Sequence, residues 1–513
     1  MPNRSTDTLF LLIKSLEKGE KRNFKLYANR NSSSSEELKV VQLFDALDKM
    51  DLYDEALLLK KNKGIMKQQL SNLKAHLYKQ ILASLRVLDD EANIDVLLHE
   101  QMDYARILYN KGLYYQSLRI LDKAKEIAKA NNQFTFVQQV LFFEKKIEAL
   151  YITRSMQDRA DSLSIQSDEI KCSLSLVSDL SNLALQLYSW YIKHGHSRNE
   201  KEAAEVQEFF NERLGEKAVK CKSFYEKLYL YQSYCWNYFI KQDFPQYYRY
   251  TQKWVDLFEE SPFMIQVETG HYIKGMHNLM GAYFDLAKHE KLSETLEKFE
   301  QFCESAVAKQ NINNRILCFV YRTISIFNKH FLEGSFSEGT KRVPEIEANL
   351  KEYELYVDRH RILVFYYKIA CLYFGSGDYE KTIDYLNKII NWKVDLRTDL
   401  QCYSRLLHLI AHYELGNEQI LDHLIKSVYR FMAKMQNLSV VEEEIFKFIR
   451  KSFSLSVRNI KPELEKLLIK LKTLQSNRFE TRAFIYLDII SWIESKLDNI
   501  PVQEVLKKKF VTQ

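Results

Sequence analysis

Apolar residues recur at steps of three and four through almost the whole sequence, and this period constrains the fold more than any other feature. Near the start, one such stripe consists of Leu70, Leu73, Leu77, Ile81, Leu85 and Leu88. Near the end, another consists of Phe479, Ala483, Tyr486, Ile490, Ile493 and Leu497. Side chains at this spacing share one face of an α-helix, whereas a strand shows strict alternation. The pattern therefore predicts an all-α protein.

The scarcity of turn-forming residues supports long helices joined by short links. The 513 residues include only 13 glycines and 6 prolines, whereas sheet proteins need many tight turns built from these two residue types. A chain of this length exceeds what one compact core accommodates. We therefore expect several domains or one elongated array.

The predicted helices fall into consecutive segments. Residues 1–90 form a helical N-terminal module, in which one helix runs from Thr8 to Glu17 and is interrupted at Gly19, and a long one runs from Lys67 to Leu88. The polar run from Asn31 to Ser35 is the clearest loop, because short polar side chains compete for backbone hydrogen bonds. Residues 91–436 contain paired helices, and residues 437–513 form a C-terminal helical cap.

Two helix pairs are the clearest. One runs Ile94–Asn110 and Leu113–Ala130, and the other runs Arg361–Phe374 and Tyr379–Asn391. Each link contains glycine, which ends helices readily because it adopts the left-handed conformation at little cost. The link from Gly375 to Asp378 is therefore interpreted as a turn between helices. A phosphate-binding loop is not favoured there, because no strand precedes it and no GxxxxGK[ST] motif is present.

Residues at matching offsets carry a family resemblance. The first pair contributes Tyr104, Ala105, Leu108, Gly112, Ser117, Leu121 and Ala124. The second pair contributes Ile369, Ala370, Tyr373, Gly377, Thr382, Leu386 and Ile389. With these residues the chain resembles the tetratricopeptide repeat, a motif of about 34 residues that forms two antiparallel helices. Segments around Cys235 and Ile410 keep the spacing more loosely.

The resemblance implies a tetratricopeptide-like superhelix, a right-handed solenoid of antiparallel helix pairs with helical caps at both ends. Such pairs cannot bury their apolar faces alone, so they stack and create an extended concave surface for peptides or partner proteins. The positions that the resemblance assigns to this groove are His99, Met102, Arg106, Tyr109, Tyr367, Cys371, Phe374, His408 and His412.

Charge and cysteine usage exclude some classes of partner. The net charge of +6 is weak for this length and does not resemble the basic stripe of a nucleic-acid binder. The 7 dispersed cysteines form no CxxC pair, which is typical of a reducing cytosol. No signal peptide is visible, and no segment approaches the roughly 20 apolar residues that span a bilayer. We expect a cytoplasmic protein with no membrane partner.

Motifs for catalysis or metal binding are weak. His408 and His412 have the i, i+4 spacing of two metal ligands, but no glutamate stands between them as in HExxH. Two semi-buried histidines in a packed helix are the favoured interpretation. No catalytic signature appears in the sequence. We therefore predict no catalytic site, no cofactor and no metal.

Two hypotheses of function follow. The leading one is an interaction scaffold that binds a peptide or a partner protein in the concave groove. The alternative is a peptide-responsive regulator, in which residues 1–90 act as an effector or nucleic-acid-binding module. The layout is similar to bacterial sensors that join a small helical module to a repeat domain. An enzyme, with a site assembled from distant residues, has no motif in its favour.

Overall fold

The computed structural model describes residues 7–30, 35–62, 64–88, 93–151, 158–353, 356–392, 398–435, 440–452, 457–480 and 488–512. Every regular element within these ranges is a helix, so the prediction of an all-α protein is confirmed. The chain divides into two compact units, residues 1–167 and 168–513, which we call unit 1 and unit 2. The three-segment division expected from the sequence stays a prediction.

Unit 1 begins with helices that bury a hydrophobic cluster of their own, in which the rings of Phe24 and Phe44 lie 4.6 Å apart. The predicted helix Lys67–Leu88 is present as α5. The expected interruption at Gly19 is wrong, because the first helix ends at Ser15 and Gly19 lies inside the second. The helices are α1 (Thr8–Ser15), α2 (Lys18–Arg30), α3 (Ser35–Asp48), α4 (Glu55–Lys61), α5 (Lys67–Leu88), α6 (Ile94–Asn110), α7 (Tyr114–Ala130), α8 (Phe134–Tyr151) and the start of α9 (Arg159–His194).

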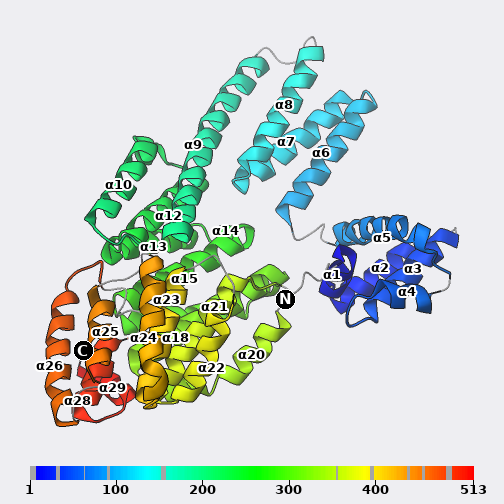
Figure 1. Cartoon of the computed structure of the whole chain (residues 1–513). Helices are drawn as coiled ribbons and strands as arrows, with labels where there is room; N and C mark the ends of the chain where they lie inside the picture. The colour runs from blue at the N-terminus through cyan, green and yellow to red at the C-terminus, as the bar shows by residue number, and fades with distance from the viewer. Residues whose placement is uncertain are drawn as a thin grey trace. The chain divides into compact units, whose positions relative to one another are not determined.

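Unit 2 continues from α9, and its successive helices pack against their neighbours in the chain (Figure 1). Its further helices are α10 (Glu200–Leu214), α11 (Lys217–Lys220), α12 (Phe224–Ile240), α13 (Phe244–Glu259), α14 (Phe263–Val267), α15 (Thr269–Asp285), α16 (His289–Cys303), α17 (Ala306–Lys309), α18 (Ile312–Glu333), α19 (Phe336–Thr340), α20 (Val343–Glu352), α21 (Arg359–Ser376), α22 (Tyr379–Ile390), α23 (Thr398–Glu414), α24 (Glu418–Lys434), α25 (Val440–Ser452), α26 (Val457–Leu474), α28 (Ile489–Asp498) and α29 (Val502–Thr512).

One backbone motif recurs where the first helix of a pair ends. The residues with positive φ at these turns are Gly112, Gln242, Ala287, Gly377 and Gly416, with φ between 52° and 87°. At Gly377, for example, its own N–H donates to the Phe374 carbonyl and the next N–H donates to the Tyr373 carbonyl. This is the Schellman ending, which satisfies carbonyls that the helix leaves free. The same hydrogen bonds at every one of these turns show that the paired helices share one construction.

The two best repeat matches also share a contact between their helices. Ser117 Oγ on α7 donates to the Ala105 carbonyl on α6 over 2.8 Å. Thr382 Oγ1 on α22 lies 3.5 Å from the Ala370 carbonyl on α21, in the same relation. Both hydroxyls are fully buried, so the small residue of the first helix and the hydroxyl of the second let the helices approach closely.

The apolar stripe near the C-terminus does not form one helix. Phe479 lies in a turn, and Asp488 caps a new helix by accepting from the Ser491 N–H. The stripe's Ala483 and Tyr486 lie outside the described residues, as does most of the polar run from Asn31 to Ser35. The expectation of a single helical face from Phe479 to Leu497 is therefore wrong.

Among the described residues, no helix is both long enough and apolar enough to cross a membrane.

Candidate functional site

A hollow of about 370 Å³ lies in unit 2 along the first helices of consecutive pairs. Its lining comes mainly from α9, α12, α15, α18 and α21. We call this hollow the groove and define it by its most prominent lining residues: Tyr188, Trp236, Lys274, His277, Asp285, Tyr321, Arg361, Tyr367 and Lys368.

Helix α15 shows how the sequence builds this lining. Lys274, His277, Asn278, Gly281 and Asp285 all line the groove, and their spacing places them on one face of the helix. The adjoining stripe on the same helix is apolar and buried in the core. Helix α15 therefore packs its apolar stripe into the core and directs its polar stripe into the hollow.

Lys274 lies in the groove over aromatic rings. Its Nζ is 5.3 Å from the ring centroid of Tyr188 and 5.6 Å from that of Trp236. These contacts are cation–π interactions, which contribute modestly to holding an ammonium. Within the described residues Lys274 makes no hydrogen bond or ion pair, and burial lowers the pKa of its ammonium.

Lys368 on α21 supplies a second ammonium. Its Nζ donates to Asn328 Oδ1 over 2.7 Å and lies 5.2 Å from the ring centroid of Phe331. No carboxylate of the described residues comes within 4.0 Å of it. Burial lowers the pKa of Lys368 to about 8, because desolvation disfavours the charged form.

His277 occupies the centre of this positive region. Its ring stacks on Tyr321, with centroids 4.0 Å apart and an angle of 8° between the planes. Burial and then the charges of Lys368, Lys274 and Arg361 lower the pKa of His277 to about 3, so the imidazole is neutral at pH 7. Its Nδ1 is buried without a hydrogen-bond partner among the described residues.

The third cation of the groove has a carboxylate partner of its own. Arg361 Nε lies 3.3 Å from Asp358 Oδ2, and its guanidinium lies 5.8 Å from the Tyr321 ring centroid.

Asp285 is the carboxylate of the groove lining. Burial raises the pKa of Asp285 to about 7, although the charge of Lys368 opposes this shift. At neutral pH the carboxyl is therefore only partly ionised, and the positive charges of the groove exceed the negative ones.

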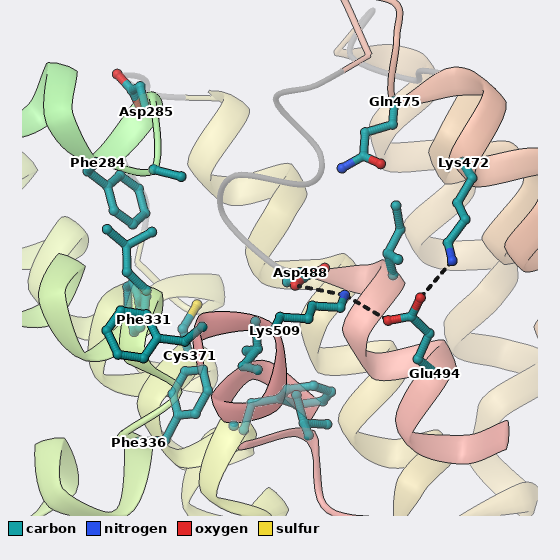
Figure 2. Close-up of a pocket in the computed structure, with 18 of the residues that line it drawn as sticks. Phe284, Asp285, Phe331, Phe336, Cys371, Lys472, Gln475, Asp488, Glu494 and Lys509 are labelled. Atoms are coloured by element: carbon teal, nitrogen blue, oxygen red, sulfur yellow. Dashed lines mark ion pairs between the residues drawn. The ribbon is translucent and has the colours of Figure 1, made fainter. Parts of the chain in front are cut away.

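A second cavity, of about 580 Å³, adjoins the groove and shares Phe284 and Asp285 with it (Figure 2). Figure 2 shows an aromatic side, which includes Phe331 and Phe336, facing a charged side from α26, α28 and α29. On the charged side, Glu494 accepts from Lys509 over 2.7 Å and pairs with Lys472 over 2.8 Å. These charges compensate one another, in contrast to those of the groove.

The C-terminal helices are held against the helix pairs by specific contacts. A Cβ at Gly334, where φ is 65°, would lie 2.8 Å from the Gln503 carbonyl oxygen of α29. Ser337 Oγ donates to Gln503 Oε1 over 2.8 Å. Trp492 Nε1 on α28 donates to Glu414 Oε1 over 2.7 Å. Helix α29 therefore packs at a position where only a glycine, Gly334, leaves room for its backbone.

The predicted groove residues of the first repeat lie on α6 in unit 1. Met102 is buried, and the rings of His99 and Tyr109 contact Phe136 and Phe143 of α8, with centroids 4.8 and 5.5 Å apart. The exposed Arg106 pairs with Asp103 in the preceding turn of the same helix over 3.3 Å. These four residues face a neighbouring helix or solvent, and a role in partner binding stays a prediction.

The predicted residues of unit 2 are divided between the two cavities. Tyr367 lines the groove, whereas Cys371 and Phe374 line the adjoining cavity. Burial raises the pKa of the Cys371 thiol to about 12, so the thiol is protonated. His408 and His412 contact each other with ring centroids 4.5 Å apart, and neither is among the residues that line the two cavities.

Sequence reasoning missed the residues that give the groove its charge, namely Lys274, Lys368 and Arg361. Their helical spacing carried a readable signal, since Arg361 and Lys368 are seven positions apart on one helix, as are Tyr321 and Asn328 on another. Polar residues at that spacing on otherwise apolar helices indicate a shared solvent-facing surface.

Compared with models of known protein families and with curated proteins, the chain matches none. Across the described ranges, no three or more His, Cys, Asp or Glu side chains gather as a metal site requires.

Proposed function

We propose that the chain is an interaction scaffold, and that the groove of unit 2 holds an extended peptide segment of a partner protein. In this proposal the helix pairs continue as a tetratricopeptide-like superhelix, with the groove on its concave face. The lining of the groove is the observation that supports this proposal. The first helices of consecutive pairs direct aromatic and cationic side chains toward the same hollow. Aromatic rings and cations are the side chains that dominate recognition surfaces.

The size and character of the hollow fit this use. A volume of about 370 Å³ accommodates a few side chains rather than a folded domain. Tyr188 is 39% exposed and lies against Trp236, with ring centroids 4.9 Å apart. When a ligand covers exposed aromatic surface of this kind, the burial stabilises the complex.

The test is selection of peptides from a random library displayed on phage, with the full chain as bait. The selected peptides are then measured against Tyr188→Ala and against the control Tyr429→Ala. Tyr429 is similarly exposed at 45% but lies on α24, outside the groove. We expect the groove variant to lose about tenfold in affinity, which corresponds to about 1.4 kcal/mol, and the control to lose little. Equal affinity for both variants would contradict the groove assignment.

A further inference from the structure

We propose that the groove recognises a carboxylate on the bound peptide, held by the ammonium groups of Lys274 and Lys368, with an apolar side chain beside it against Tyr188 and Trp236. This inference rests on the proposed function and names the chemistry of the ligand.

The first support is a contrast with two shielded lysines of this chain that do have a carboxylate partner. Lys125 pairs with the buried Glu144 over 2.7 Å, and Lys74 pairs with Asp7 over 2.8 Å. Within the described residues the Lys274 ammonium makes cation–π contacts but no ion pair, and the hydrogen-bond partner of Lys368 is a neutral amide oxygen. Both groove lysines therefore lack the direct carboxylate partner that Lys125 and Lys74 have.

The second support is the electrostatic state of their surroundings. Burial lowers the pKa of His277 to about 3, and the charges of Lys368, Lys274 and Arg361 add to this shift, so all three cations act on one buried ring. An unpaired ammonium in a shielded site is costly. A bound carboxylate removes this cost by forming charge-assisted hydrogen bonds, which are stronger than neutral ones.

The resident carboxyl does not serve this purpose. Asp285 lines the groove but forms no ion pair within 4.0 Å among the described residues. A bound carboxylate would supply the direct ion pair that Asp285 does not make, although the charges of Asp285 and Lys368 act on each other's pKa.

The rings of the groove favour a peptide over a nucleic acid. His277 and Tyr321 stack on each other at 4.0 Å, so the faces that they share are not open to a base. Single-stranded nucleic acids are usually held by rings whose faces stack with successive bases. A side-chain or C-terminal carboxylate of a peptide can pair with Lys274, while a neighbouring apolar side chain packs against Tyr188 and Trp236.

The experiment compares fluorescein-labelled ten-residue peptide pools that are random except for a central Glu-Phe or Gln-Phe pair. Each pool is made with a free and with an amidated C-terminus, which separates side-chain from terminal carboxylates. Binding to the full chain is measured by fluorescence polarisation for the wild type, for Lys274→Met with Lys368→Met, and for the control Lys381→Met with Lys388→Met. The control lysines lie on α22, and their side chains are 57% and 44% exposed.

We expect the wild type and the control to prefer a carboxylate-bearing pool at least tenfold over its neutral counterpart. The groove variant is expected to lose that preference while its circular dichroism spectrum stays unchanged. Equal affinity of the wild type for the carboxylate-bearing and neutral pools overturns the inference. So does a groove variant that still prefers the carboxylate-bearing pool. Displacement of the bound pool by oligothymidylate at lower concentration than by unlabelled peptide also overturns it. If library peptides lose affinity on Tyr188→Ala but show no carboxylate preference, the scaffold proposal stands and only this inference fails.

Discussion

Replacing Lys368 by methionine is expected to stabilise unit 2 at pH 7. Burial lowers the pKa of this lysine from 10.5 to about 8, and a pKa change of one corresponds to about 1.4 kcal/mol. Keeping the ammonium charged in the folded protein therefore costs about 3 kcal/mol. Methionine keeps the apolar stem but loses the hydrogen bond to Asn328, which offsets about 1 to 2 kcal/mol. The expected net gain is about 1 to 2 kcal/mol.

The sign of the pH dependence follows from the same change in pKa. Below pH 8 the lysine is charged in both the folded and the unfolded chain, so the full cost is present. Between pH 8 and the unfolded value of 10.5 the folded chain releases its proton first. The advantage of the methionine variant should therefore shrink over this range.

The assay is urea unfolding followed by tryptophan fluorescence at pH 7, 9 and 10.5, with free energies taken from the transition midpoints. Lys381→Met is the control, because Lys381 is 57% exposed and pairs only at the surface with Asp378. It should change stability by no more than about 0.5 kcal/mol. A Lys368→Met variant that is less stable than the wild type at pH 7, or whose stability difference does not vary with pH, would show that the buried ammonium does not destabilise the fold.

Further predictions follow from the same contacts. Asp285→Asn should raise the melting temperature more at pH 8 than at pH 5. With a pKa raised to about 7, the folded carboxyl is neutral at pH 5 and must be ionised, at a cost in stability, at pH 8. Equal changes in melting temperature at both pH values would contradict this. Gly334→Ala should expose α29 to limited proteolysis, whereas Gly416→Ala, with φ of 68° but open space around it, should not. Affinity for a carboxylate-bearing peptide should fall above pH 8, as Lys368 loses its proton next to Asp285 and Cys371; a flat profile from pH 7 to 9.5 would contradict this.

Helix boundaries were predictable where local chemistry decides them. The helices Lys67–Leu88 and Ile94–Asn110 have the predicted bounds, and Asn93 caps the start of the second by accepting a hydrogen bond from the Asp95 N–H. Glycine marks the turns at Gly112 and Gly377, but the same turn occurs at Gln242 and Ala287. At those two turns the residue in the left-handed conformation is not a glycine, so residue type alone does not indicate the turn.

Other features depended on contacts distant in sequence. The sequence pattern places Gly375 in the turn, but it lies inside α21, where a Cβ would overlap the ring of Phe336. The helical spacing of Arg361 and Lys368 indicates a polar helix face, but the sequence does not distinguish an open solvent-facing surface from a hollow, because lysines in amphipathic helices normally face solvent. The stacking of α15 against α18, and of α18 against α21, places both ammonium groups in one hollow.

Photo-crosslinking locates the bound peptide on the chain without any substitution in the groove. A library-selected peptide carrying a diazirine side chain is irradiated on the full chain, and the adducts are mapped by mass spectrometry. We expect adducts on residues that line the groove, such as Tyr188, Trp236 and Tyr321. Adducts confined to α16, α22 and α24, which contribute no residue to the groove, would contradict it.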